Sequence, residues 1–130
     1  EDGKIVQVGS LDLKMNHAGK AMWNAHSPNR CHIAIAFLGW GLLDKNHKTW
    51  SGIIADRWVD RRGNIWHPAT DLQEKSLEML VRHLMQEYKI NAKDICGHSE
   101  CAIPLGRKID PGGSLSFTME ELRNKLGANK

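Results

Sequence analysis

The sequence has no long hydrophobic run and little proline. No stretch approaches the ~18 consecutive apolar residues of a membrane span, and the first residues do not have the pattern of a signal peptide. With four prolines and 41% hydrophobic residues, the composition is close to the globular average, which excludes collagen-like, disordered and low-complexity chains. The 130 residues therefore predict one soluble domain that buries roughly two-thirds of its unfolded surface.

The sequence also has few cysteines and a small net charge. Cys31, Cys96 and Cys101 show no Cys-x-x-Cys spacing, which argues against a disulfide scaffold and a four-thiolate zinc site. We expect reduced thiols, with a Cys96–Cys101 bridge as the alternative. The net charge of +3 is small and the longest basic cluster is Arg61-Arg62, so neither a nucleic acid nor a membrane is predicted as a partner. The oligomeric state is not predicted.

The first third of the chain predicts two strands separated by a loop. Residues 1–4 have the composition of a hairpin turn that enters a strand at 5–8, and residues 9–30 are loop-like. Residues 33–38 form a continuous apolar run, as in a central strand buried on both faces. Since the hairpin turn has no partner strand before it, we expect an N-terminally incomplete domain.

The middle section, about 42–68, contains most of the tryptophans. Residues 57–60 and 64–67 flank Arg61-Arg62-Gly63, which predicts a second hairpin. The tryptophans either fasten this section to the body of the domain or form a platform on which sugars stack. They are Trp50, Trp58 and Trp66, with Trp40 just before the section.

Two helices are predicted in the second half. Thr70 and Gln73 form a capping-box pattern, after which apolar residues recur at helical spacing to residue 88. Thr118 and Glu121 repeat the pattern at the start of a last helix through residue 126. The predicted fold class is therefore α/β, a single domain of residues 1–130 with helices packed on a central mixed β-sheet.

The segment 97–112 carries the residues best suited to chemistry. His98 is followed twelve residues later by Asp110, after a loop rich in proline and glycine and the basic pair Arg107-Lys108. Imidazole nitrogen and carboxylate oxygen are ligands that suit Zn²⁺. Two protein ligands alone make a weak site, because catalytic zinc usually has three together with an open position.

This segment resembles the C-terminal motif of the zinc-dependent N-acetylmuramoyl-L-alanine amidases, whose fold is shared with peptidoglycan recognition proteins. The family has Gly-His followed, after a loop, by Arg-Lys-x-Asp-Pro-Gly. The matching segments occur in the family's order over nearly the whole chain, and the section at about 42–68 is an insertion. They are 2–7, 16–19 with Trp23, 33–38, 97–98 and 107–112.

The resemblance implies a role for each matching residue. His98 and Asp110 would be zinc ligands, and Lys108 would stabilise the oxyanion when zinc-activated water attacks the amide. Arg107 would support its loop or contact the substrate. The expected substrate-binding residues are His17, Ala18, Gly19, Trp23 and Arg107.

The chain also departs from the family pattern. The family's first zinc ligand lies on a strand before the hairpin, and Ala36 stands where some subfamilies have a glutamate general base. His17 and Cys101 are the alternatives for a third ligand, and Glu100 is the alternative for the base. We expect structural or solvent-facing roles for His26, His32, His47, His67 and His83.

The resemblance implies a bacteriolytic, zinc-dependent peptidoglycan hydrolase. It would cleave the amide between N-acetylmuramic acid and the L-alanine of the stem peptide. The expected location is the cytoplasm, for a cell-wall recycling enzyme or for a phage or prophage endolysin that is released to the wall. The alternatives are a catalytically silent peptidoglycan-binding module of the same fold and a metal-free structural protein.

Overall fold

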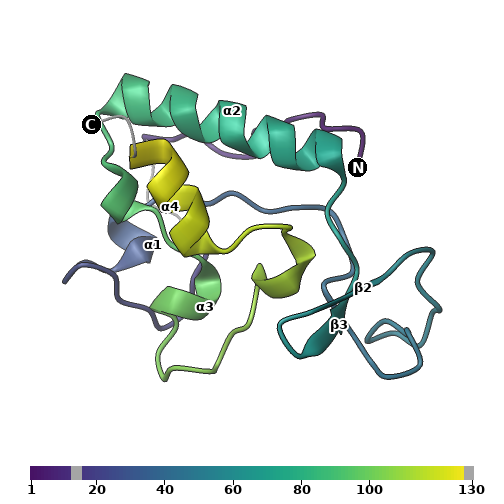
Figure 1. Ribbon diagram of the computed structural model, residues 1–130. Coiled ribbons are helices and arrows are strands. Elements are labelled where there is room, and N and C mark those ends of the chain that lie inside the picture. Colours follow the sequence, from purple (N-terminus) through teal and green to yellow (C-terminus); the bar gives the residue numbers. More distant parts are fainter. Residues whose placement is uncertain (13–15, 128–130) are drawn as a thin grey trace.

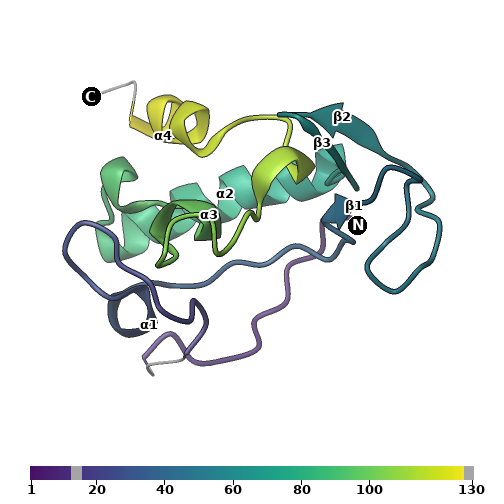
Figure 2. The ribbon, with the colours of Figure 1, turned by 90° about the horizontal axis from the view of Figure 1, so that it is seen from below.

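A computed structural model describes residues 1–12 and 16–127 of the chain. The helix α2 (Asp71–Tyr88) runs along one side of the domain, and α4 (Met119–Gly127) packs beside it (Figure 1). The short helices α1 (Pro28–Cys31) and α3 (His98–Cys101) lie on the other side of the core (Figure 2). Within the described ranges, no helix has both the length and the apolar character needed to cross a membrane.

The helix α2 begins where the capping box predicts it. The Thr70 hydroxyl accepts a hydrogen bond from the Gln73 backbone N–H (3.1 Å), and the Gln73 side chain accepts one from the Thr70 N–H (2.9 Å). Two of the free N–H groups at the helix start are thus satisfied. At the other end Lys89 adopts a left-handed conformation (φ 55°), which stops the helix. The predicted helix over 70–88 is confirmed.

The hydrophobic core lies between α2, α4 and the turn η1 (Ala92–Asp94). Leu77 and Val81 of α2 meet Leu122 and Leu126 of α4, and Leu115 is 1% exposed at the centre. The predicted final helix is confirmed, because α4 follows Thr118, whose hydroxyl accepts from the Glu121 N–H. Packing of one apolar stripe against another supplies most of the stability of such helices.

The sheet is small and antiparallel. It consists of β1 (Leu42–Leu43), β2 (Val59–Arg61) and β3 (Asn64–Trp66) in the order β1-β3-β2. Arg61 pairs with Asn64, and the turn residues Arg62 (φ 54°) and Gly63 (φ 79°) both have positive φ, as a two-residue hairpin requires. The second hairpin is confirmed, and so is the fold class in which helices combine with a sheet.

The prediction of strands at 5–8 and 33–38 is wrong, because neither segment pairs with another strand in a ladder. Residues 33–40 run as an extended ribbon past α2 (Figure 2). Among the described residues, the backbone of 33–37 has no backbone hydrogen bond. Ile35 is 38% exposed and Leu38 is 80% exposed, so the apolar run is only partly covered. A strand needs a partner as well as a suitable sequence, and the described strands all lie between 42 and 66.

The middle section supports the loop that follows Asp110. Trp66 is 4% exposed and lies against Gly112 and Gly113, where a Cβ on either glycine would overlap the indole ring. Arg61 donates to the Gly113 carbonyl (3.1 Å) and Arg62 to the Gly112 carbonyl (2.6 Å). Trp66 therefore fastens this section to the domain, as the first of the two interpretations expects, whereas Trp50 is 86% exposed.

Candidate metal centre

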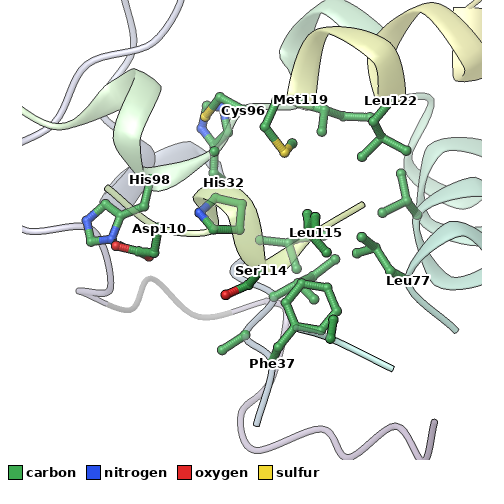
Figure 3. Close-up of a pocket in the computed structure, with 18 of the residues that line it drawn as sticks. His32, Phe37, Leu77, Cys96, His98, Asp110, Ser114, Leu115, Met119 and Leu122 are labelled. Atoms are coloured by element: carbon green, nitrogen blue, oxygen red, sulfur yellow. Dashed lines mark hydrogen bonds and ion pairs between the residues drawn. The ribbon is translucent and has the colours of Figure 1, made fainter. Parts of the chain in front are cut away.

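A cavity of about 990 Å³ separates the extended segment 33–38 from α2. Side chains of α2 and the core, among them Leu77 and Leu115, form its apolar wall, and His98 and Asp110 lie on its rim (Figure 3). A mostly apolar hollow with a few convergent polar groups is the usual form of a small-molecule site.

His98 and Asp110 lie next to each other, as the sequence predicts. The distance between His98 Nδ1 and Asp110 Oδ2 is 3.1 Å. His98 is the first residue of α3, and the Ser99 N–H donates to the Asp110 carbonyl (2.9 Å), which holds the loop beside the helix. The His98 side chain is 22% exposed and that of Asp110 is 62% exposed, so solvent reaches the pair.

The hydrogen bonds of His98 define its tautomer. Its Nε2 lies 3.0 Å from the Ala18 carbonyl oxygen, which can only accept a hydrogen bond. Nε2 therefore carries the proton, and in the neutral ring Nδ1 presents a lone pair to the Asp110 carboxylate. Two acceptors at 3.1 Å need a cation between them, either a proton or a metal ion. A backbone carbonyl that fixes the ring in this way is typical of metal-ligating histidines.

The loop that contains Ala18 is fixed to the loop that contains Arg107. The Arg107 guanidinium donates to the carbonyls of Ala18 and Lys20, both at 2.9 Å, and lies against Gly19 (φ 62°). Ala21 and Ala102 form an antiparallel bridge in the same region. Arg107 thus has the loop-supporting position expected for it, and it places the carbonyl that orients His98.

His17 and Trp23 make contacts away from the His98–Asp110 pair. His17 Nε2 lies 2.9 Å from the Pro28 carbonyl and 3.2 Å from the His32 carbonyl, so it donates to backbone acceptors. Trp23 donates through Nε1 to the Lys93 carbonyl (3.0 Å) and lies 5.3 Å from the Arg123 guanidinium. Their predicted roles in substrate binding remain predictions.

Lys108 and Ala36 lie in irregular, exposed segments. Lys108 is two residues before Asp110 on the same loop, as the expected oxyanion role requires. Ala36 lines the cavity, whereas its neighbour Ala34 is not among the lining residues. Neither position carries an acidic group.

Glu100, the alternative for the general base, is held in an ion pair. Its carboxylate accepts from Arg123 at both oxygens (2.8 and 2.7 Å) and from the Gly97 N–H (2.8 Å). Burial acts to raise the pKa of Glu100, but the hydrogen bonds from Arg123 and Gly97 outweigh it and leave that pKa below its usual value. A carboxylate committed to an arginine is a poor proton acceptor, so the structure argues against this alternative.

We expect Glu100→Gln to remove a pH-dependent part of the stability. Because the folded-state pKa of Glu100 is lowered, the contribution is complete above the unfolded value of about 4.3 and is lost as the pH falls through the folded value. At pH 7 the variant should be less stable by about 1–3 kcal/mol, as for hydrogen bonds to charged groups. Urea unfolding from pH 3 to 8 measures the difference, which should shrink at low pH.

The control for this experiment is Glu87→Gln, an exposed glutamate on α2. It should leave the unfolding curves unchanged over the same range. A loss of stability in Glu100→Gln that is equal at pH 3 and pH 7 would contradict the ionic role of Glu100.

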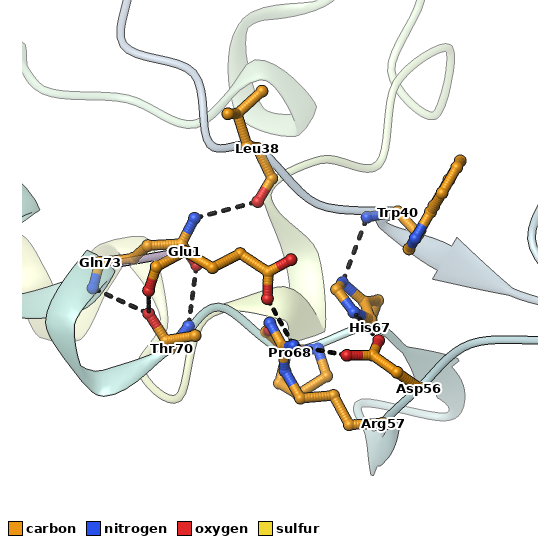
Figure 4. A network of polar contacts seen from close by, with 9 residues as sticks. All are labelled: Glu1, Leu38, Trp40, Asp56, Arg57, His67, Pro68, Thr70 and Gln73. Carbon is orange, nitrogen blue, oxygen red and sulfur yellow. Dashed lines mark hydrogen bonds and ion pairs between the residues drawn. The ribbon is translucent and has the colours of Figure 1, made fainter. Parts of the chain in front are cut away.

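A second group, Glu1, Asp56 and His67, has ligand atoms within 4.8 Å of one another. His67 is 2% exposed, and its Nδ1 accepts from the Trp40 N–H (3.2 Å), so Nε2 carries the proton and donates to Asp56 Oδ1 (2.8 Å). Arg57 pairs with both Glu1 and Asp56 (Figure 4). The imidazole has no free lone pair and the carboxylates already face a cation, which indicates a structural network rather than a metal site.

The cysteines are free thiols, as expected. Cys101 is buried, and its Sγ lies 3.7 Å from the His98 carbonyl. Burial, followed by the neighbouring Cys101, raises the pKa of Cys96 to about 12. A thiol with a raised pKa is a weak metal ligand, since metals bind the thiolate.

Sequence reasoning missed the partner that orients His98. That partner is the carbonyl of Ala18, eighty residues away, and a backbone carbonyl leaves no signal in the sequence. The His67–Asp56 pair was also missed, because its members are eleven positions apart and strands β2 and β3 lie between them.

The fold thus combines helices with a small antiparallel sheet and brings a histidine–aspartate pair to the edge of a mostly apolar cavity. A sequence model of the family described as N-acetylmuramoyl-L-alanine amidase matches residues 1–113, and the chain belongs to this family. The match includes the section 42–68. No curated protein and no solved structure shows significant similarity to the chain.

Proposed function

We propose that the protein hydrolyses the amide between the lactyl group of N-acetylmuramic acid and the L-alanine of the stem peptide. The observation that carries this proposal is the His98–Asp110 pair, in which two acceptors face each other at 3.1 Å. Family membership supplies the substrate class. The reaction consumes one water and yields a lactyl carboxylate and a free α-amino group on L-alanine.

The residues of the pair fit a zinc ion. His98 Nδ1 and an Asp110 oxygen are the donors, and both side chains are open to solvent. When bound, zinc would activate a water molecule and polarise the amide carbonyl. The Ala18 carbonyl keeps the proton of His98 on Nε2, and Arg107 holds that carbonyl in place. Lys108, on the same loop, would provide positive charge for the oxygen of the tetrahedral intermediate.

Zinc analysis tests the metal site directly. After dialysis against trace Zn²⁺, the protein should contain close to one equivalent, and His98→Ala and Asp110→Ala should contain almost none. His83→Ala, an exposed histidine on α2, is the control and should retain the metal. Full zinc content in Asp110→Ala would remove that residue from the site.

The activity itself is measured as new L-alanine amino groups. Soluble muropeptides test the role in cell-wall recycling within the cytoplasm, and intact sacculi test the bacteriolytic role of an endolysin. If protein that contains zinc hydrolyses neither substrate, the proposed reaction is overturned.

One observation favours a second function, a peptidoglycan-binding module without activity. Ala36 lines the cavity at the position where part of the family has a glutamate, so a general base is missing there. In this case muropeptides would bind the protein without being cleaved. Calorimetry with an uncleavable muropeptide, together with the hydrolysis assay, separates the two functions.

A further inference from the structure

Asp110 has few contacts that fix its side chain. The carboxylate is 62% exposed, and among the described residues its hydrogen-bonding contact is with His98 alone. The place of its oxygens therefore depends on how the backbone of the loop is held. On one side α3 anchors this backbone, because the Ser99 N–H donates to the Asp110 carbonyl (2.9 Å).

The hairpin of β2 and β3 anchors the loop on the other side of Asp110 (Figure 1). The Arg62 guanidinium donates through one nitrogen to the carbonyls of Gly112 (2.6 Å) and Leu115 (3.2 Å), so it joins the two ends of the turn that follows Asp110. Trp66, from the same hairpin, packs against Gly112. Gly112 is two residues from Asp110, so a shift of this turn would move the carboxylate.

Arginine is an unfavourable residue for its place in the hairpin. Arg62 has φ 54°, in the left-handed region that residues other than glycine, asparagine and aspartate seldom occupy. A two-residue turn with positive φ at both positions favours Asn-Gly, and Gly63 already supplies the glycine. The turn alone thus favours asparagine at position 62, whereas the contacts of the guanidinium with the loop favour arginine.

We propose that Arg62 is a positioning residue of the metal centre, which keeps the Asp110 carboxylate beside His98 by holding the backbone two residues further on. The inference rests on the proposed function, in which Asp110 is a metal ligand. It gives the section 42–68 a part in the chemistry, because a hairpin of this section would set the strength of metal binding without touching the metal.

Arg62→Asn separates positioning from folding. Asparagine improves the turn, which offsets the lost hydrogen bonds, so the midpoint of urea unfolding without metal should change little. Zinc affinity, measured by competition with a chelator, should fall by about 10-fold. This is the lower end of the range for outer-shell partners, since Arg62 acts through the backbone. Arg62→Lys keeps a cationic donor for the two carbonyls and should restore most of the affinity.

The sign of the change distinguishes positioning from an effect of charge. Removing a positive charge near a divalent cation should strengthen its binding, whereas loss of positioning weakens it. Lys45→Asn is the control, since it removes one positive charge from an exposed residue of the same section. It should not weaken zinc binding.

The outcomes separate this inference from the proposed function. If His98→Ala loses zinc while Arg62→Asn binds it as tightly as the original protein, Arg62 does not position the site and the proposed function stands. A large fall in the unfolding midpoint of Arg62→Asn would assign Arg62 to the stability of the fold and also overturn the inference. Arg62→Gly, which suits a positive φ equally, provides the same test if Arg62→Asn does not fold. If the original protein binds no zinc, both fall.

Discussion

Replacing Lys108 by alanine is expected to lower kcat for amide hydrolysis by about 10²–10³-fold while the zinc content stays unchanged. Loss of one group that stabilises a developing oxyanion typically has this effect. Lys108 is exposed and lies two residues before Asp110, so its removal should leave the His98–Asp110 pair in place. Steady-state kinetics on a soluble muropeptide, together with zinc analysis of the same sample, measures both quantities.

A matched variant separates this effect from a general loss of positive charge. Lys75→Ala removes an exposed lysine of α2 and should leave kcat unchanged. If Lys108→Ala retains the original kcat, Lys108 does not act in the reaction. If it loses zinc as well as activity, its role is to maintain the site.

Introducing a carboxylate at position 36 is expected to increase the turnover of this protein. Ala36 lines the cavity, and the family resemblance implies that some subfamilies have a glutamate base at this position. General bases contribute about 10²–10⁴-fold, so Ala36→Glu should raise kcat by up to that range if the new carboxylate reaches the attacking water. The pH–rate profile should then show a new acidic limb.

Ala34→Glu is the control for this substitution. Position 34 belongs to the same extended segment but is not among the residues that line the cavity. A glutamate there adds the same charge and should leave kcat unchanged. Equal rates for Ala36→Glu and the original protein would indicate that the missing glutamate does not limit activity.

Most of the helical structure could be predicted from the sequence, because its signals are local. Thr70 and Gln73 are three residues apart and cap α2 through bonds to each other. Arg62 and Gly63 have the positive φ values that a tight two-residue turn requires. Interactions of this kind depend on a few neighbouring residues, so a capping box or a turn pair is sufficient to specify them.

The strands show where local signals fail. Residues 33–38 have the composition of a central strand, yet they form no ladder, whereas the short strands lie in the section interpreted as an insertion. A strand becomes part of a sheet only when another segment satisfies its backbone groups. A continuous apolar run carries no information about which segment that is.

The sequence alone determined the helices α2 and α4, the hairpin at Arg62-Gly63, and the pairing of His98 with Asp110 through the family resemblance. Only the tertiary structure decided the tautomer of His98 and the ion pair between Glu100 and Arg123. It also decided the packing of Trp66 against Gly112 and Gly113, and the lack of hydrogen-bond partners among the described residues at the buried ring nitrogens of His32. The physical reason is distance along the chain. Helix capping and turn formation depend on residues that are near neighbours in the sequence. The features that only the tertiary structure decided depend on groups far apart in the sequence, whose distances are set when the chain folds.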